Sequence, residues 1–516
     1  MPLDRALIPV LVACGQVTER DRSGLGSVPI QLMAKACLRA AEDAGVSALL
    51  ADVGHIAAAS LTVDAAMVKT PVSRRYKNLP KSVANLLGVT PKRFSYVHAG
   101  GNTPQFLVNH FAEQISLGKE QTVLLTGGES LATMFAKFNR WYKWFFPKAE
   151  WQDDPGGSPT MMGDDRASGT KLEARHGLEL PANVYPLFEN ALQAHYGRTN
   201  EQHRLAIGEL FAKFTEVAAA NPYAWFQEAR TAQQLTTESA QNRMVAHPYT
   251  KNLNSMIMVN QAAAIVMTSL ERAKTLGIAD DKLVYLHGCA DANDIWNLTE
   301  RKNFHSSPAM RRCAQEALKM AGKSIDELAW FDLYSCFPAA VQIACDEFGL
   351  AHDDARGLTL TGGLPYFGGP GNNYSMHAIA EMMQRVRANS GDYGLLNANG
   401  WYLTKHSLGV YSNVPLEKAW QRADKGGYQA EILADKGPPV AEKPAGKATL
   451  ETFTVVYDKK AKPRQGIVFG RLESGARFVA NTPRDPSMIQ ALCDGRAIGR
   501  SGKVKSRSGR NTFFLD

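Results

Sequence analysis

Side chains that could do chemistry are plentiful in this chain, but the spacings that mark common active sites are missing. The seven cysteines include no Cys-x-x-Cys pair, which excludes the usual zinc spacings and a disulfide scaffold, so we expect no metal. The sequence has no Gly-x-Ser-x-Gly turn, no P-loop, no His-Glu-x-x-His and no Gly-x-Gly-x-x-Gly after a strand. The Gly-Gly-Pro-Gly run at 368–371 lacks a basic residue at P-loop spacing, so we interpret it as a loop where the backbone passes close to another group.

Length and composition indicate a globular protein of several domains. The chain has 516 residues, of which 45% are hydrophobic and 21% are charged, and domains of about 100–200 residues predict two to four of them. No apolar run approaches the roughly 18 residues of a membrane helix. The apolar stretch 6–15 is interrupted by Pro9, so it predicts a buried strand rather than a signal peptide, and we expect a cytoplasmic protein.

Positive charge is concentrated at one end of the chain. The net charge is +8, and residues 449–516 hold 13 Lys and Arg against 6 Asp and Glu. Short β-rich runs at 453–457, 466–472 and 476–480, separated by turn signals, predict a small closed barrel there. A stretch rich in Gly and Pro, 426–448, predicts a linker in front of it.

Strand and helix signals alternate before that linker. The predicted strands are 8–13, 94–97, 123–125, 283–287, 330–333, 393–396 and 408–411. The predicted helices are 30–44, a segment from Thr103 as N-cap to Gly118, 308–321, a helix that ends at Gly349, and 374–388. Each half has a helix that ends in Ala-Gly and a strand that opens at a tight turn into a helix, which favours duplicated βαβ halves.

Between the halves, residues 131–245 look like an irregular insertion. Eight aromatic residues crowd into 135–151. They predict a satellite core under the insertion; the alternative is a lid over an apolar ligand. The predicted organisation is an N-terminal half over 1–250 with this insertion, a C-terminal half over 251–425, the linker 426–448 and the barrel 449–516.

The order of five short motifs resembles the thiolase superfamily, in particular the sterol-carrier-protein thiolase branch. The motifs are Gly101-Asn102-Thr103-Pro104 with Gly127-Gly128-Glu129-Ser130, Asn260-Gln261-Ala262-Ala263-Ala264, Asp332-Leu333-Tyr334-Ser335-Cys336-Phe337, Gly362-Gly363 with Gly368-Gly369-Pro370, and Lys405-His406-Ser407-Leu408-Gly409. The resemblance covers residues 1 to about 425. It implies a duplicated α/β fold of five layers (αβαβα), here with an extra C-terminal antiparallel barrel that is similar to oligonucleotide-binding folds.

The departures from that family concern its reactive groups. Thiolases use a Cys nucleophile, a His that activates it and a second Cys that moves a proton. The corresponding positions here are Gly101, Gly369 and Leu403. A standard thiolase reaction through a covalent acyl-enzyme is therefore not expected.

What the resemblance leaves is a set of polar groups around the former nucleophile. Backbone N–H groups of Gly101 and Lys405 would form the oxyanion hole. Six side chains would line the pocket: Asn102, Tyr334, Ser335, Cys336, Asn373 and His406. Tyr334 and His406 would act as general acid and base. The alternatives are a packed core tyrosine, a small buried apolar residue at Cys336, and an exposed histidine at 406.

These residues favour a protein that binds acyl-CoA thioesters. The leading hypothesis is a non-standard carbon–carbon bond or acyl-transfer enzyme, with coenzyme A as part of the substrate and no bound cofactor. The alternatives are an inactive acyl-CoA or lipid-binding protein, and a retro-aldolase or hydratase that acts on 3-hydroxyacyl-CoA. No membrane partner is expected. A nucleic-acid partner is not favoured, because no aromatic residue interrupts the basic run 496–510. A homodimer through residues 122–126 and a monomer are both left open.

Overall fold

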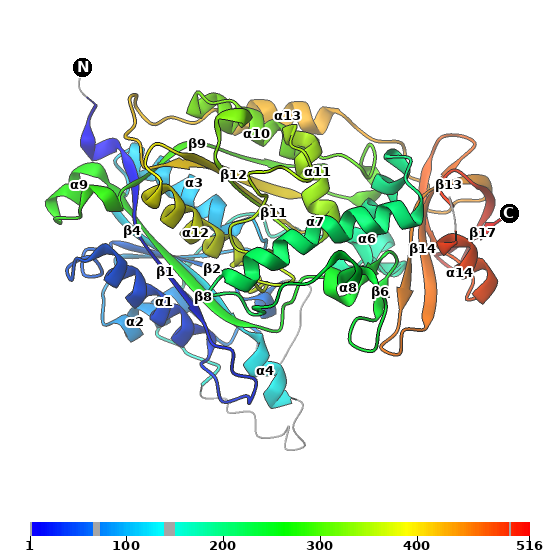
Figure 1. Ribbon diagram of the computed structural model, residues 1–516, viewed down its shortest axis with the longest axis horizontal. Coiled ribbons are helices and arrows are strands. Elements are labelled where there is room, and N and C mark those ends of the chain that lie inside the picture. The colour runs from blue at the N-terminus through cyan, green and yellow to red at the C-terminus, as the bar shows by residue number, and fades with distance from the viewer. Residues whose placement is uncertain (1–2, 66–72, 139–149, 495–496) are drawn as a thin grey trace.

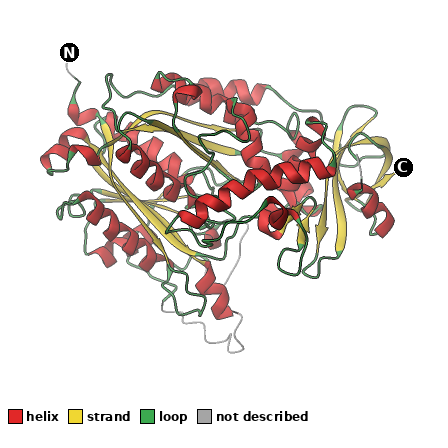
Figure 2. Cartoon of the chain, in the orientation of Figure 1, coloured by secondary structure: helices red, strands yellow, loops and turns green. Residues whose placement is uncertain are grey.

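Two β structures organise the chain, a large sheet and a small barrel (Figure 1). The computed structural model describes residues 3–65, 73–138, 150–494 and 497–516. Helices flank the large sheet, and the barrel lies at the end of the molecule that carries the C-terminus (Figures 1 and 2). Within these ranges, no helix is both long enough and apolar enough to cross a bilayer.

Ten strands of the described residues hydrogen-bond in the order β10-β11-β12-β9-β1-β8-β4-β2-β3-β5. They are β1 (Pro9–Thr18), β2 (His55–Ala59), β3 (Arg93–Val97), β4 (Thr122–Ser130), β5 (Thr160–Met162), β8 (Asn260–Ser269), β9 (Val284–Asn293), β10 (Trp330–Leu333), β11 (Tyr393–Gly400) and β12 (Lys405–Ser412). Only two residue pairs join β1 to β9, Val10 with Tyr285 and Leu11 with Val284. This narrow junction lets the two halves of the sheet lie on either side of a central helix layer.

The helices complete five layers. They are α1 (Pro29–Ala44), α2 (Leu79–Leu87), α3 (Thr103–Ser116), α9 (Leu270–Thr275), α10 (Pro308–Ala321), α11 (Pro338–Phe348) and α12 (Tyr374–Ala388). α1 and α2 cover the outer face of the first half, and α10 covers the second half at β9 and β12. α3 and α12 contact each other and strands of both halves, so they form the middle layer. The predicted duplicated five-layer fold is confirmed.

The insertion is helical rather than irregular. Its elements are α4 (Leu131–Phe138), α5 (Lys171–Arg175), α6 (Pro181–His195), α7 (Asn200–Ala220), α8 (Ala232–Thr236), β6 (Met244–Ala246) and, just after it, β7 (Tyr249–Thr250). The sequence carried a signal for three of them, because Thr170, Thr199 and Thr231 each form a capping box with a Glu or Gln three residues later. Most of the aromatic run at 135–151 lies outside the described residues.

The predicted linker also contains regular structure. Helix α13 (Lys425–Ala434) begins at Asp424, whose side chain accepts a hydrogen bond from the Gly426 N–H. Its buried residues Tyr428 and Ile432 face β9 and α10. The Gly and Pro content suggested an irregular segment, but this apolar contact decides in favour of a helix. The domain boundaries themselves stay predictions.

In its described residues the barrel has five strands and one helix. They are β13 (Gly446–Tyr457), β14 (Pro463–Leu472), β15 (Arg477–Asn481), α14 (Pro486–Cys493), β16 (Ser501–Arg507) and β17 (Arg510–Leu515). Pairing runs β14-β15-β17-β16-β13 and returns from β13 to β14, so the barrel is closed, as predicted. The β15–β17 pair is parallel, which corrects the expectation of a wholly antiparallel barrel. Five strands in a small closed barrel are typical of the oligonucleotide-binding fold.

Candidate functional site

The former nucleophile turn joins β3 to α3. Asn102 is the N-cap of α3 and Thr103 its first residue, one position earlier than predicted. The Gly100 N–H donates to Asn372 Oδ1 at 2.8 Å, and Ser375 Oγ donates to the Gly101 carbonyl at 2.7 Å. The turn is therefore held by the loop and first helical turn that begin α12.

Gly101 has no room for a side chain. A Cβ atom there would lie 2.5 Å from the Asn399 carbonyl oxygen, and closer still to the Tyr334 hydroxyl oxygen. Real Cβ atoms are essentially never found so close to another heavy atom. The space that a nucleophilic side chain needs is thus filled by Tyr334.

The three side chains that follow β10 are buried and do not ionise readily. Burial raises the pKa of the Tyr334 phenol and raises the pKa of the Cys336 thiol to about 12. Asn399 Nδ2 donates to Cys336 Sγ at 3.8 Å, and Ser335 Oγ accepts a hydrogen bond from the Leu364 N–H at 3.3 Å. At neutral pH the Cys336 thiol is protonated, which makes it a poor nucleophile.

His406 belongs to a separate buried cluster. Its Nε2 lies 3.0 Å from Asp294 Oδ2 and 3.3 Å from Ser307 Oγ, and Ser307 Oγ donates to the same Asp294 oxygen. In a Ser–His–Asp triad the serine and the carboxylate contact different ring nitrogens, whereas here both contact Nε2. Ser307 is also the N-cap of α10, so the cluster holds the start of a helix. No hydrogen bond joins His406 to Tyr334.

Lys405 opens β12 and points into the protein. Its ammonium donates to the carbonyls of Ala99 at 2.9 Å and Asp164 at 2.8 Å. Burial lowers the pKa of Lys405 to about 8, and the charge of Asp164 partly opposes that shift. The backbone of Lys405 pairs with Gly400 on one side and Asn293 on the other, so it is part of the sheet.

The side-chain amides of Asn102 and Asn373, which were predicted to bind substrate, both donate hydrogen bonds to other groups of the protein. Asn102 Nδ2 donates to Ser407 Oγ at 3.2 Å, and Asn373 Nδ2 donates to the Gly127 carbonyl at 2.7 Å. Among the residues that the structure describes, Asn373 Oδ1 is buried without a hydrogen-bond partner. The structure thus brings the side chains of Tyr334 and Lys405 to the turn that holds Gly101. The Lys405 ammonium and the Gly101 carbonyl form hydrogen bonds within the protein.

Three residues that build this region were missed. Asn372 holds the turn, and Asn399 separates Gly101 from Cys336. Tyr185 comes from the insertion and donates to the Trp401 carbonyl at 3.0 Å. No local pattern in the sequence marks them, because each acts through residues far away in the chain.

The other two lost family positions differ from Gly101. A Cβ at Gly369 would meet Leu364 at 3.4 Å and the Met256 carbonyl at 3.5 Å, so there is space for one. Leu403 is buried in the left-handed region at φ 52°, and its N–H donates to Tyr185 Oη at 3.3 Å.

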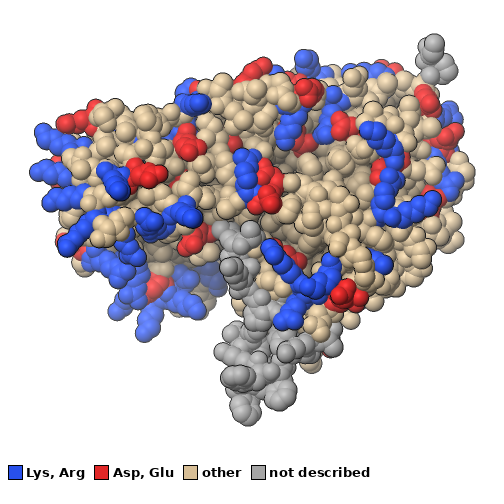
Figure 3. Space-filling model, turned by 180° about the vertical axis from the view of Figure 1, so that it is seen from behind, with Lys and Arg blue, Asp and Glu red and all other residues tan. Residues whose placement is uncertain are grey.

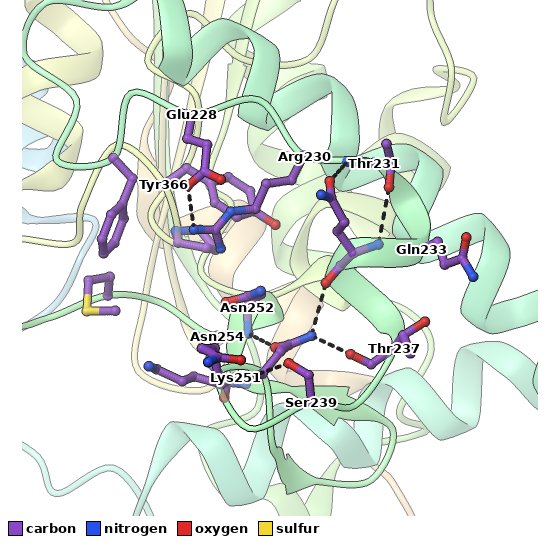
Figure 4. A pocket seen from close by; sticks show the side chains of 16 residues that line it. Glu228, Arg230, Thr231, Gln233, Thr237, Ser239, Lys251, Asn252, Asn254 and Tyr366 are labelled. Carbon is purple, nitrogen blue, oxygen red and sulfur yellow. Dashed lines mark hydrogen bonds and ion pairs between the residues drawn. The ribbon is translucent and has the colours of Figure 1, made fainter.

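A cavity of about 520 Å³ lies between the insertion and the Gly-rich loop. Ion-paired Glu228 and Arg230 lie on one side of it, and Lys251 and Asn254 on another (Figure 4). Tyr366 also lines it. Its hydroxyl and Asn254 Oδ1 are buried and have no hydrogen-bond partner in the part of the chain that the structure describes. None of the predicted catalytic residues lines this cavity.

Comparisons with known proteins agree with the fold. A family model described as the thiolase-like protein type 1 additional C-terminal domain matches residues 428–508. The acetyl-CoA acetyltransferase of Methanothermobacter thermautotrophicus is 25% identical over 198 residues, 38% of this chain and 48% of that protein. A 3-ketoacyl-CoA thiolase of Citrobacter koseri is 29% identical over 161 residues, 28% of this chain and 35% of that protein. The chain thus spans about half or less of these curated relatives.

One solved structure matches the whole chain. It is described as a monomeric SCP2-thiolase like protein type 1 (STLP1) from Mycobacterium smegmatis, with 36% identity, a TM-score of 0.84 and full coverage of both chains. The match includes both thiolase-like halves and the extra barrel. This chain therefore belongs to the family of SCP2-thiolase like proteins type 1.

Proposed function

We propose that this protein binds acyl-CoA thioesters and does not transfer their acyl group through a covalent enzyme intermediate. The observation that carries the second part is the contact of Tyr334 with the Gly101 position, which leaves no room for a nucleophile. Burial keeps the nearest thiol, that of Cys336, protonated at neutral pH. Catalysis by Tyr334 and His406 stays a hypothesis, and the experiment below tests it.

The cavity beside the Gly-rich loop offers groups that suit a coenzyme A ester. Arg230 and Lys251 supply positive charge for phosphates, and Lys251 is exposed. Amide side chains of Gln234, Asn252 and Asn254 can bond the peptide-like groups of the pantetheine arm.

A short path of contacts connects this cavity to the former nucleophile turn. Met256 lines the cavity, and its backbone bonds Leu364 at 3.1 Å and Gly369 at 2.8 Å. The Leu364 N–H in turn bonds Ser335, the neighbour of Tyr334. A ligand in the cavity is therefore one loop away from the position where thiolases hold the thioester.

Calorimetric titration with CoA, acetyl-CoA and a long-chain 3-hydroxyacyl-CoA tests the proposal, with product analysis of the same mixtures. We expect binding of the esters and no acyl group attached to the protein. An acylated protein, detected as a mass increase of the intact chain, would overturn the second part of the proposal. A product formed without an acylated protein would support catalysis by Tyr334 and His406. No heat with any ester would overturn the binding part.

Two variants locate the binding. Arg230→Ala removes a cation that lines the cavity, so we expect about three- to tenfold weaker ester binding. Lys251→Ala is expected to weaken binding in a salt-dependent way. Lys92→Ala, an exposed lysine of the first half, serves as the control and should bind like the wild type. Equal affinity for all four proteins would place the ligand elsewhere.

We further propose that the protein is a monomer. β4 lies between β8 and β2, so both its edges are occupied within the chain. Of the two states that the sequence left open, this favours the monomer over a homodimer that pairs through residues 122–126. Beyond β2, the next strand of the first half is β3, and its outer side is covered by β5 of the same chain through three residue pairs. Covered edges cannot extend the sheet into a second copy. Sedimentation equilibrium should give a single species of 56.4 kDa, and a mass of twice that value would contradict the proposal.

A further inference from the structure

The barrel has one side buried against the thiolase-like body and one side free. Ile467, Phe469 and Val479 of β14 and β15 pack in the core of the body, whereas their neighbours Val468 and Ala480 face the barrel core. Oligonucleotide-binding barrels commonly use the face of their second and third strands for ligands. In this protein the corresponding face, formed by β14 and β15, packs against the thiolase-like body and is not available to a ligand.

The free side carries a row of cations that we call the basic face. It consists of Lys447 on β13, Lys503, Lys505 and Arg507 on β16, and Phe514 on β17, all of them exposed. Lys and Arg side chains gather over the barrel end of the molecule, at the left of Figure 3. None of the four cations has an ion pair among the described residues.

The strand register places like charges directly opposite each other. Lys447 pairs with Lys503 across β13 and β16. Lys503, Lys505 and Arg507 alternate with inward residues such as Val504, so neighbouring cations are about 7 Å apart along the strand. Opposed like charges destabilise a sheet, and a bound chain of negative charges would remove that repulsion.

An aromatic side chain lies inside this row. Phe514 is directly opposite Lys503 on β17, and its side chain is 39% exposed. Lys505 Nζ lies 5.9 Å from the centre of its ring. An exposed aromatic ring between cations is the arrangement on which bases of single-stranded nucleic acids stack while their phosphates meet the positive charges.

We infer that the basic face binds single-stranded nucleic acid. The sequence alone did not favour a nucleic-acid partner, because no aromatic residue lies within the basic run 496–510. In the folded protein, the pairing of β17 with β16 places Phe514 beside these cations. An anionic membrane surface would also attract these cations, but the exposed ring between them favours nucleic acid, whose bases can stack on it. The inference is independent of the proposed acyl-CoA site.

Fluorescence anisotropy of a labelled oligo-dT of about 20 nucleotides with the full-length protein tests this inference. We expect binding that weakens steeply between about 50 and about 200 mM salt. Lys503→Glu/Lys505→Glu should weaken binding by at least about tenfold and lower the salt slope by about 1.4, since each phosphate contact contributes about 0.7. Phe514→Ala should weaken it by about fivefold or more.

The matched control is Lys92→Glu/Lys119→Glu, which makes the same charge change at exposed lysines of the body. It should bind oligo-dT like the wild type, and neither double variant should have a lower melting temperature than the wild type. Equal losses in both double variants, or no binding by the wild type, would overturn the inference. Tighter binding to phosphatidylserine vesicles or to polyglutamate than to oligo-dT would also overturn it.

Discussion

A Gly101→Cys variant, which restores the nucleophile of the thiolase family, is expected to lose about 3 kcal/mol of unfolding free energy and to gain no thiolase activity. The new Cβ would collide with the Tyr334 hydroxyl and with the Asn399 carbonyl. The second collision is with backbone that belongs to β11, so a change of side-chain rotamer cannot relieve it. Urea unfolding measures the loss, and thioester cleavage measures the activity.

Two further variants separate the causes of that loss. Gly101→Ala adds the same Cβ without a thiol, so it should lose nearly as much stability. Gly427→Cys makes the same replacement in α13, where a Cβ meets nothing within 4 Å, so it should stay within about 0.5 kcal/mol of the wild type. If the Gly101→Cys protein were as stable as the wild type, the turn could accommodate a Cβ atom at position 101, and our account of the Tyr334 and Asn399 contacts would be wrong.

The second large effect is expected at Arg477, where the barrel meets the body. Its guanidinium is fully buried, binds both carboxylate oxygens of Glu451 at 2.8 and 2.6 Å, and donates to the carbonyls of Thr299, Arg301 and Lys302. Arg477→Ala would leave the three backbone carbonyls without these donors, and the Glu451 carboxylate would keep only its hydrogen bonds from Arg471. We expect a loss of about 3–5 kcal/mol in urea unfolding.

The contribution of this cluster should depend on pH. Burial tends to raise the pKa of Glu451, but the hydrogen bonds from Arg477 and Arg471 outweigh burial and hold it below its ordinary value. A carboxyl whose pKa is lowered by folding contributes stability above its unfolded value of about 4.3 and loses it as the pH falls. The difference between wild type and Arg477→Ala should therefore shrink below about pH 4.

Arg471→Ala is the matched control, because Arg471 binds the same carboxylate but is one-third exposed. It should cost at most about 1 kcal/mol. Arg477→Lys should recover little, since one ammonium cannot reproduce the planar set of donors that meets the carboxylate and three carbonyls. A loss at Arg477 no larger than that at Arg471 would contradict this account of how the barrel is attached.

Local signals were sufficient to predict many elements. β10, α10 and α12 have the predicted bounds. For α10 the reason is visible in the chain, because Ser307 caps its start and Gly322 adopts the left-handed conformation at its end. The sequence analysis did not predict the helices of the insertion or α13. Three helices of the insertion do carry a local signal, the capping boxes at Thr170, Thr199 and Thr231. Helix α13 is stabilised instead by the apolar contacts of Tyr428 and Ile432.

The sequence by itself determined the order of the five motifs, the loss of the three reactive groups and the charge of the barrel. Each of these features depends only on the residue types and their positions along the chain. Only the tertiary structure decided that Tyr334 fills the place of the nucleophile, that His406 belongs to a helix cap, and that Phe514 joins a row of lysines. These facts depend on contacts between residues from different strands and loops. Strand register and packing set such contacts, and no local pattern in the chain records them.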